Sequence, residues 1–365
     1  MNVALRFHWM LPKGGELGMR TAWETSRVLT TENASPAALP DMDAWIDFAG
    51  CAEAIGIDSV LISFSRYEPD TLLVACALGR AVRKLKFIAA YRLGLMQPTT
   101  FVQQLNTLSA LIDGRIALNV VAGSSPVEQR GYGDFLDHDQ RYARAGEFLA
   151  ISNAFWHNRG NVDVNFAGEY YRIEKGRICT PFLAPKRCAP EIYIAGHSPQ
   201  AQRLARARGN CWMRLIDTPE TLRAPVARAR EHGIEVCLRL CLVCRSTREE
   251  AMRAAAALLP QDGGITRRER HILRSSDSQT LQGALAIADQ VDWLNQQLWT
   301  GLVPHYGSSA ITLVGSFDEV ASALLDYKRI GVTQFVISGW PKLEEMMIFG
   351  RDVLPLIRRA EQARQ

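Results

Sequence analysis

The chain has 365 residues, which is long enough for one large α/β barrel or for two ordinary domains. Apolar residues make up 47% and charged residues 22% of the sequence, a globular composition that excludes a disordered chain. The 42 basic and 38 acidic residues give a net charge of +4, which is too small to indicate nucleic-acid binding. No apolar stretch approaches the length of a membrane-spanning helix, so we expect no membrane partner.

The cysteines and the N-terminus indicate a cytoplasmic protein. The 8 cysteines lie mostly in apolar stretches, which predicts buried free thiols in a reducing compartment. Cys241 and Cys244 are three residues apart in a run that predicts a strand, so their side chains point to opposite faces and do not form a metal or redox pair. The N-terminal sequence has no signal-peptide pattern.

Short apolar runs alternate with longer amphipathic segments along most of the chain. A strand followed by a helix, repeated about eight times, predicts right-handed crossovers, a parallel sheet and a TIM (β/α)8 barrel. A doubly wound sheet is the alternative, but no GxGxxG motif follows the first strand. The predicted strands are Val3–Trp9, Ser59–Ser63, Lys86–Tyr91, Ile116–Val121, Glu191–Ala195, Asn210–Arg214, Glu235–Cys244 and Gln334–Ser338. The predicted helices are Met42–Ala54, Thr71–Val82, Thr99–Leu111, Tyr142–Trp156, Gln200–Ala207, Pro219–Glu231, Glu249–Leu259 and Phe317–Arg329.

Three segments depart from this repeat, and we interpret them as insertions in a single domain that spans residues 1–365. Residues 11–41 form a polar loop after the first strand, on the barrel face where active sites lie. Residues 158–180 contain two alternating runs around Ala-Gly, a pattern that predicts a β-hairpin. Residues 260–310 have little regular hydrophobic pattern, and we expect them to close over the site.

Candidate site residues are sought at the carboxyl ends of the strands. Arg239 lies in an otherwise apolar strand, so it is either paired within the barrel or directed at an anionic ligand. Gly196-His197-Ser198 opens a helix, where free N–H groups favour a phosphate, although Ser198 is equally a helix cap. His138 is a base, a phosphate contact or a solvated loop residue. Metal, GxSxG and Walker motifs are lacking, so we expect no metal site.

An ordered set of segments resembles the bacterial luciferase-like flavin monooxygenases, and most closely the alkanesulfonate monooxygenase branch. The segments span nearly the whole chain and include FHWMLP, GIDSVLI, LKFIAAYR, LIDGRIALNVVAGSSPVEQRGYG, LDHDQRY, IYIAGHSPQAQ, IEVCLRLCLVCRSTREEA and ITLVGSFDEVASALLDYKRIGVTQFVISGWPKLEE. The family fold is a TIM barrel, in agreement with the separate count of strands.

The resemblance implies a two-component, group C enzyme that uses reduced FMN from an NAD(P)H-dependent flavin reductase, and molecular oxygen. A peroxyflavin would then oxygenate a small organic substrate. The resemblance also implies a homodimer or homotetramer. It assigns Ala89-Ala90 to a non-prolyl cis peptide behind the flavin ring, Asn119 and Gly123 to the ring, His138 and Tyr142 to flavin contacts, and His197 and Ser198 to the phosphate.

The substrate-side residues depart from the sulfonate branch. Glu68 replaces its cysteine, Cys241 its histidine and Trp340 its tyrosine, while the loop LVPHYGSSAITLVG lacks its arginine. We therefore expect a specialised substrate other than a simple alkanesulfonate, with Arg239, Glu68, Cys241 and Trp340 as candidate catalytic residues. Glu68 would repel a sulfonate and favour a cation or amine. The candidate substrate-binding residues are His8, Trp9, Tyr67 and His305.

Three alternatives to this function remain open. The chain is a desulfonating alkanesulfonate-type monooxygenase, a deazaflavin (F420)-dependent oxidoreductase of the same fold, or a flavin-binding protein without turnover. The sulfonate-branch motifs favour FMN over the deazaflavin.

Overall fold

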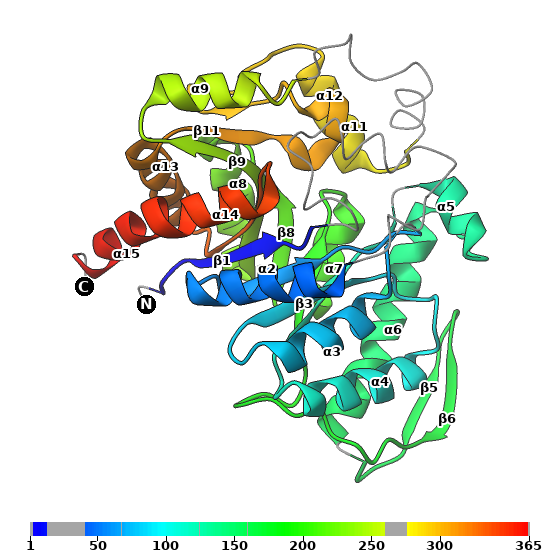
Figure 1. The fold of residues 1–365 in the computed structure, drawn as a ribbon. Coiled ribbons are helices and arrows are strands. Elements are labelled where there is room, and N and C mark those ends of the chain that lie inside the picture. The colour runs from blue at the N-terminus through cyan, green and yellow to red at the C-terminus, as the bar shows by residue number, and fades with distance from the viewer. Residues whose placement is uncertain are drawn as a thin grey trace. The chain divides into compact units, whose positions relative to one another are not determined.

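The computed structural model describes residues 3–12, 41–66, 68–123, 125–158, 160–259 and 276–363. Eight parallel strands close into a barrel and alternate with helices along the chain, which confirms the predicted TIM barrel (Figure 1). The barrel strands, in order around the ring, are β1 (Arg6–Met10), β2 (Ser59–Ile62), β3 (Lys86–Tyr91), β4 (Ile116–Val120), β7 (Glu191–Ala195), β8 (Cys211–Leu215), β9 (Glu235–Arg245) and β12 (Gln334–Ser338).

The helices begin and end at local signals that the sequence contains. In α13, Ser316 and Glu319 form a reciprocal capping box at the start, and Gly331 ends the helix with a φ of 108°. The helices are α2 (Met42–Ala54), α3 (Thr71–Ala81), α4 (Pro98–Leu111), α5 (Pro126–Gly131), α6 (His138–Asn158), α7 (Pro199–Arg208), α8 (Pro219–Glu231), α9 (Arg248–Ala256), α11 (Gln279–Ala288), α12 (Val303–Tyr306), α13 (Phe317–Ile330), α14 (Lys342–Ile348) and α15 (Leu354–Gln362).

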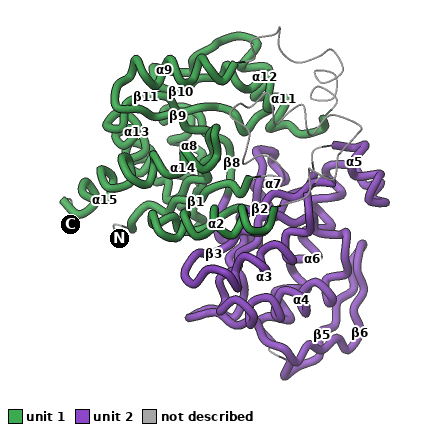
Figure 2. Tube along the Cα trace, viewed as in Figure 1, with its two compact units in different colours: residues 1–61, 213–365 green, residues 62–212 purple. Residues whose placement is uncertain are grey.

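The chain divides into two compact units (Figure 2). Unit one comprises residues 1–61 and 213–365, and unit two comprises residues 62–212. The expectation that residues 1–365 act as a single domain stays a prediction.

In unit one, successive residues of β1 face opposite sides of the sheet, as the alternation of a strand requires. Phe7 and Trp9 are fully buried and pack against the ring of Phe349, which follows α14. His8 faces the other way, toward Ser59 of β2 and Gln334 of β12.

The long strand β9 pairs with three strands, and its pairing with β8 closes the barrel. Residues 237–241 pair with β12, and residues 241–245 pair with β11 (Thr312–Ser316), which in turn pairs antiparallel with β10 (Leu298–Trp299). The sequence reading did not predict β10, β11 or α11. Part of the predicted 260–310 insertion is thus regular structure, while residues 260–275 lie outside the described residues, as does nearly all of the 11–41 loop.

In unit two, β3, β4 and β7 pair in parallel, and the predicted hairpin is confirmed as β5 (Val164–Ala167) and β6 (Arg172–Gly176). The carboxylate of Glu147 on α6 accepts three backbone N–H groups from the hairpin turn, those of Glu169, Tyr170 and Tyr171, at 2.8–3.2 Å. These bonds fix the hairpin to α6, and Figure 1 shows the two elements side by side.

Candidate functional site

The predicted cofactor residues lie in unit two, where the first turns of α6 and α7 approach each other. His138 opens α6, and its ring lies 5.0 Å from the ring of Tyr142, at an interplanar angle of 59°. The hydroxyl of Tyr142 donates to the carbonyl of Ala195 at the end of β7 (3.2 Å). The structure therefore brings the two predicted flavin contacts together, next to the turn that enters α7.

The turn that enters α7 is packed so closely that it has no room for a side chain at Gly196. Gly196 has a φ of 130°, and a Cβ there would lie 2.7 Å from the Tyr142 hydroxyl. The indole N–H of Trp212 donates to the Gly196 carbonyl (2.8 Å), and Ser198 caps α7 by accepting the N–H of Ala201 (3.2 Å). Ser198 therefore acts as the N-cap of α7. The N–H groups and the dipole at the start of α7 also suit an anion. We call the starts of α6 and α7 with residues 195–198 the cradle.

Two predicted ring contacts lie at the end of β4. Asn119 is 4% exposed, pairs in register with Ala90 and Tyr193, and its side-chain oxygen has no hydrogen-bond partner in the described parts of the chain. A buried polar atom without a partner is costly and is often completed by a ligand. Gly123 has a φ of 85°, and a Cβ there would lie 1.4 Å from Nε2 of Gln129.

The sequence reading missed Gln129, which fixes the loop after β4. It is 1% exposed, and its side-chain amide donates to the carbonyl of Ala122 (3.0 Å). Arg141 of α6 donates to the same carbonyl (2.8 Å). No local pattern marks these contacts, because they join residues that are seven and nineteen positions apart.

The prediction of a cis peptide bond between Ala89 and Ala90 is wrong. Within the described residues the cis bond is that of Trp340–Pro341. The pair Ala89-Ala90 continues the regular register of β3 with β4, and Thr71 donates its hydroxyl to the Ala90 carbonyl (2.9 Å). The extended ladder thus holds this bond in the ordinary trans form.

The loop after β2 carries Glu68, while Tyr67 lies outside the described residues. Glu68 is partly exposed and accepts a long hydrogen bond from the hydroxyl of Ser63 (3.4 Å). Next to this loop, the sequence reading missed an ion pair between Arg92 and Glu128 (2.5 Å). The guanidinium of Arg92 also lies 5.1 Å from the ring of Phe64, so it packs the loop against α5.

Arg239 lies on β9 in unit one. Its side chain makes no hydrogen bond or ion pair in the described ranges, and the thiols of Cys237 and Cys241 are its electrostatic neighbours. Burial lowers the pKa of Arg239 below its ordinary value. Among the residues that the structure describes, Arg239 has no salt bridge, and its role as a contact for an anionic ligand stays a prediction.

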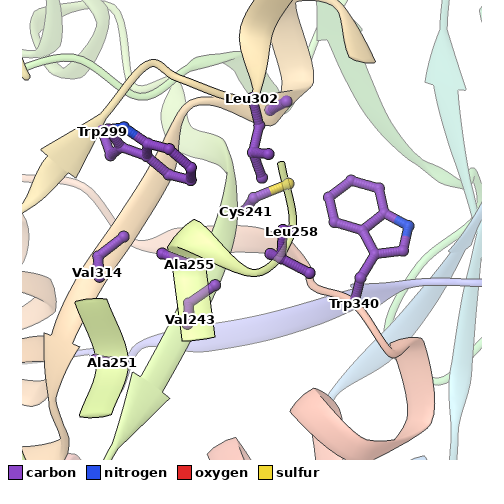
Figure 3. Close-up of a cluster of buried hydrophobic side chains, with 10 residues drawn as sticks. Cys241, Val243, Ala251, Ala255, Leu258, Trp299, Leu302, Val314 and Trp340 are labelled. Atoms are coloured by element: carbon purple, nitrogen blue, oxygen red, sulfur yellow. The ribbon is translucent and has the colours of Figure 1, made fainter. Parts of the chain in front are cut away.

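Cys241 and Trp340 lie together in a hydrophobic cluster with Trp299 and Leu302 (Figure 3). Cys241 is 1% exposed, and its sulfur lies 3.2 Å from the hydroxyl oxygen of Ser338. The Trp340 ring lies 4.4 Å from that of Tyr306, and its buried indole N–H has no partner in the described part of the chain. Next to Tyr306, His305 is partly buried in the short helix α12.

Two predicted substrate residues, His8 and Trp9, contact protein groups in the structure, and their role in substrate binding stays a prediction. Both ring nitrogens of His8 lie within hydrogen-bond distance of protein atoms, Ser59 Oγ (2.5 Å) and Gln334 Oε1 (2.8 Å). Trp9 faces Phe349 in the core instead of a pocket. The sequence predicted both near the end of the strand, but the alternation of β1 directs the two side chains to opposite faces of the sheet, so they do not line one common pocket.

All eight cysteines are free thiols, and burial raises the pKa of Cys244 well above its ordinary value. In the ranges that the structure describes, no three His, Cys, Asp or Glu side chains gather as metal ligands. Likewise, none of the described helices combines the length and apolar character needed to cross a membrane.

Comparison with known proteins assigns this architecture to a family. The profile of the luciferase-like monooxygenases matches residues 16–334. The chain belongs to this family. An EDTA monooxygenase from Chelativorans sp. BNC1 has a similar fold, with a TM-score of 0.73 and 20% identity over 98% of this chain and 94% of that one.

Two further solved structures share the fold of this luciferase-like chain. One is a riboflavin lyase with modified FMN and riboflavin, with a TM-score of 0.71 and 18% identity over 98% of this chain and 92% of that one. The other is an F420-dependent secondary alcohol dehydrogenase, with a TM-score of 0.65 and 17% identity over 98% of this chain and 100% of that one. At these identities, the similarity establishes the fold alone.

Proposed function

We propose that the protein is a two-component monooxygenase that uses reduced FMN, supplied by a separate NAD(P)H-dependent flavin reductase, and molecular oxygen to oxygenate a small organic molecule. The observation that carries this proposal is the family match over residues 16–334. The arrangement of unit two supports it, because the predicted cofactor residues gather at the cradle and at the end of β4.

The polar groups of unit two fit those of FMN. Asn119 offers a side-chain amide oxygen that has no hydrogen-bond partner among the described residues, which suits an N–H of the isoalloxazine ring. The cradle offers the start of α7 and the His138–Tyr142 pair, which suit the phosphate. Gly196 leaves space where a side chain would meet Tyr142.

Bound reduced FMN would supply the oxygen activation, and the protein would bind and orient the reactants. Arg239 would hold an anionic group of the substrate or the developing negative charge, since its guanidinium has no acceptor in the described part of unit one. Cys241 and Trp340 would contribute apolar walls instead of proton transfer, because both belong to the hydrophobic cluster.

Glu68 supports a substrate other than a simple alkanesulfonate. Its carboxylate is partly exposed and accepts a hydrogen bond from the hydroxyl of Ser63, and its negative charge would attract a cationic or amine group and repel a sulfonate. Homodimers or homotetramers and a cytoplasmic location complete the proposal, and both come from the resemblance and the sequence.

A deazaflavin-dependent oxidoreductase is the second candidate, since the F420-dependent alcohol dehydrogenase shares the fold. Anaerobic titration with reduced FMN and with reduced F420, followed by mixing with oxygen, separates the two. The proposal predicts tight binding of reduced FMN, and transfer of one labelled atom from ¹⁸O₂ into the product of a substrate screen. Binding of F420 alone, with no oxygen dependence, would overturn it.

A further inference from the structure

Asp139, the second residue of α6, links the two halves of the cradle. One carboxylate oxygen accepts from Nδ1 of His138 (2.8 Å), and the other accepts from the side-chain amide of Gln200 on α7 (2.6 Å). The hydrogen bond from His138, together with that from Gln200 and the nearby Arg203, holds the pKa of Asp139 below its ordinary value. The carboxylate is therefore charged at neutral pH and uses both oxygens to connect the helices.

The hydrogen bonds to Asp139 hold the side chains of His138 and Gln200 at the starts of α6 and α7. Because the acceptor on Asp139 takes the Nδ1–H of His138, the ring is held in one orientation, with Tyr142 against its face. Gln200 is the second residue of α7, so its bond sets the distance between the start of that helix and the start of α6. Tyr142 adds a second tie to the same turn through the carbonyl of Ala195.

We propose that Asp139 and Gln200 form a clasp that positions the cradle for a phosphate-bearing flavin and so gives the protein its preference for FMN over riboflavin. This inference rests on the proposed function, and it assigns Asp139 and Gln200 as positioning residues. Neither residue is required to touch the flavin, because the clasp acts through His138 and through the start of α7.

The direction in which FMN affinity changes when Asp139 is removed distinguishes a positioning role from a purely electrostatic one. Asp139 carries a negative charge beside a site for an anion, so by electrostatics alone its removal would strengthen phosphate binding. A clasp predicts the reverse, because loss of Asp139 frees His138 and lets the two helix starts move apart. The same loss leaves riboflavin binding almost unchanged, since riboflavin has no phosphate.

The test is anaerobic titration of the full-length protein with reduced FMN and reduced riboflavin. We expect Asp139→Ala to raise the Kd for FMN about five- to tenfold and to leave the Kd for riboflavin within about twofold. Gln200→Ala should act in the same direction with a smaller effect. The double variant should bind FMN no more weakly than Asp139→Ala alone, because the two side chains contribute to the same interaction.

Glu174→Ala is the matched control, because Glu174 is a similarly exposed carboxylate (68% against 66% for Asp139) that pairs with Arg172 on the hairpin of the same unit. It should leave both affinities unchanged. Unchanged or tighter FMN binding in folded Asp139→Ala and Gln200→Ala would overturn the clasp while leaving the proposed function intact. Wild-type protein that binds FMN no more tightly than riboflavin would overturn the proposed phosphate site and the clasp together.

Discussion

The predicted site residues of the two units differ in how their polar groups are hydrogen-bonded and packed. At the candidate site of unit two, the buried amide oxygen of Asn119 has no hydrogen-bond partner among the described residues, and Gly196 occupies a position where a Cβ would meet the Tyr142 hydroxyl. In unit one most predicted site residues are packed among apolar side chains or hydrogen-bonded to the barrel, and the guanidinium of Arg239 has no acceptor among the residues that the structure describes. The contrast suggests a prearranged cofactor site in unit two and a single electrostatic anchor in unit one.

The largest expected effect concerns the anchor. Arg239→Met should lower substrate turnover about 100-fold, because a fixed donor at the developing charge is lost. The same variant should raise the free energy of unfolding by about 1–3 kcal/mol, because a partly buried guanidinium that has no acceptor among the described residues is replaced by an apolar chain. Steady-state kinetics and urea denaturation measure the two effects.

A gain in stability together with a loss of turnover would identify Arg239 as a functional charge that folding tolerates at a cost. Loss of both would contradict this, because it would mean that the guanidinium has a structural partner.

A second prediction tests the close packing of unit two. Gly123→Ala should destabilise the protein by about 2–4 kcal/mol, because its Cβ would meet Gln129 at 1.4 Å and its φ is 85°. Gly131→Ala is the control, since nothing lies within 4 Å of a Cβ there, and it should cost little. Thermal unfolding of both variants compares them, and equal stability would show that the loop after β4 adapts freely.

A third prediction concerns the frame of unit one, where Glu361 of α15 binds Lys328 (2.6 Å), the N–H of Leu5 (2.7 Å) and Arg358 (2.9 Å). Burial raises the pKa of Glu361, but these partners more than offset it and the net pKa is lowered. The carboxylate therefore stabilises the fold above its unfolded pKa, and this contribution is lost as the pH falls through the folded pKa.

Glu361→Gln should accordingly cost about 1–2 kcal/mol at pH 7, with the difference from wild type shrinking as the pH falls below about 4. Denaturant titrations across this pH range measure the difference. A gap that stays constant with pH would show that packing, and not charge, accounts for the role of Glu361.

The smallest expected effect concerns substrate choice. Glu68→Gln should raise the KM for a cationic or amine substrate several-fold and leave kcat almost unchanged, because the carboxylate is partly exposed and its attraction is screened. Competition assays with neutral and cationic analogues measure this. An unchanged KM would remove the support for Glu68 as a specificity residue.

The sequence was sufficient for the barrel because its eight strands are apolar runs bounded by helices, and all eight predicted strands are confirmed. It was insufficient for β10 and β11, which pair beyond the barrel with the second half of β9. The short strand β10 has too few residues for any period to be detected. Of the candidate site, the pairing of His138 with Tyr142 was predictable from the family resemblance.

The rest of the candidate site depends on contacts that no local pattern encodes. Gln129 reaches the Ala122 carbonyl across a loop, and Arg92 reaches Glu128 across 36 positions. Trp9 and His8 were both placed near a ligand because they end a strand, yet the register of β1 directs each to a protein partner. The cis bond expected at Ala89 came from the resemblance, and the regular ladder of β3 excludes it.

We propose that the cradle of unit two holds the phosphate of FMN. The affinity of the Gly196→Ala variant for reduced FMN tests this hypothesis. The new Cβ would lie 2.7 Å from the Tyr142 hydroxyl, whereas Gly146→Ala on α6 places its Cβ 3.8 Å from Leu204 and serves as the control. We predict at least about a tenfold loss of affinity for Gly196→Ala and none for Gly146→Ala. A folded Gly196→Ala variant that binds reduced FMN as tightly as wild type would contradict the account.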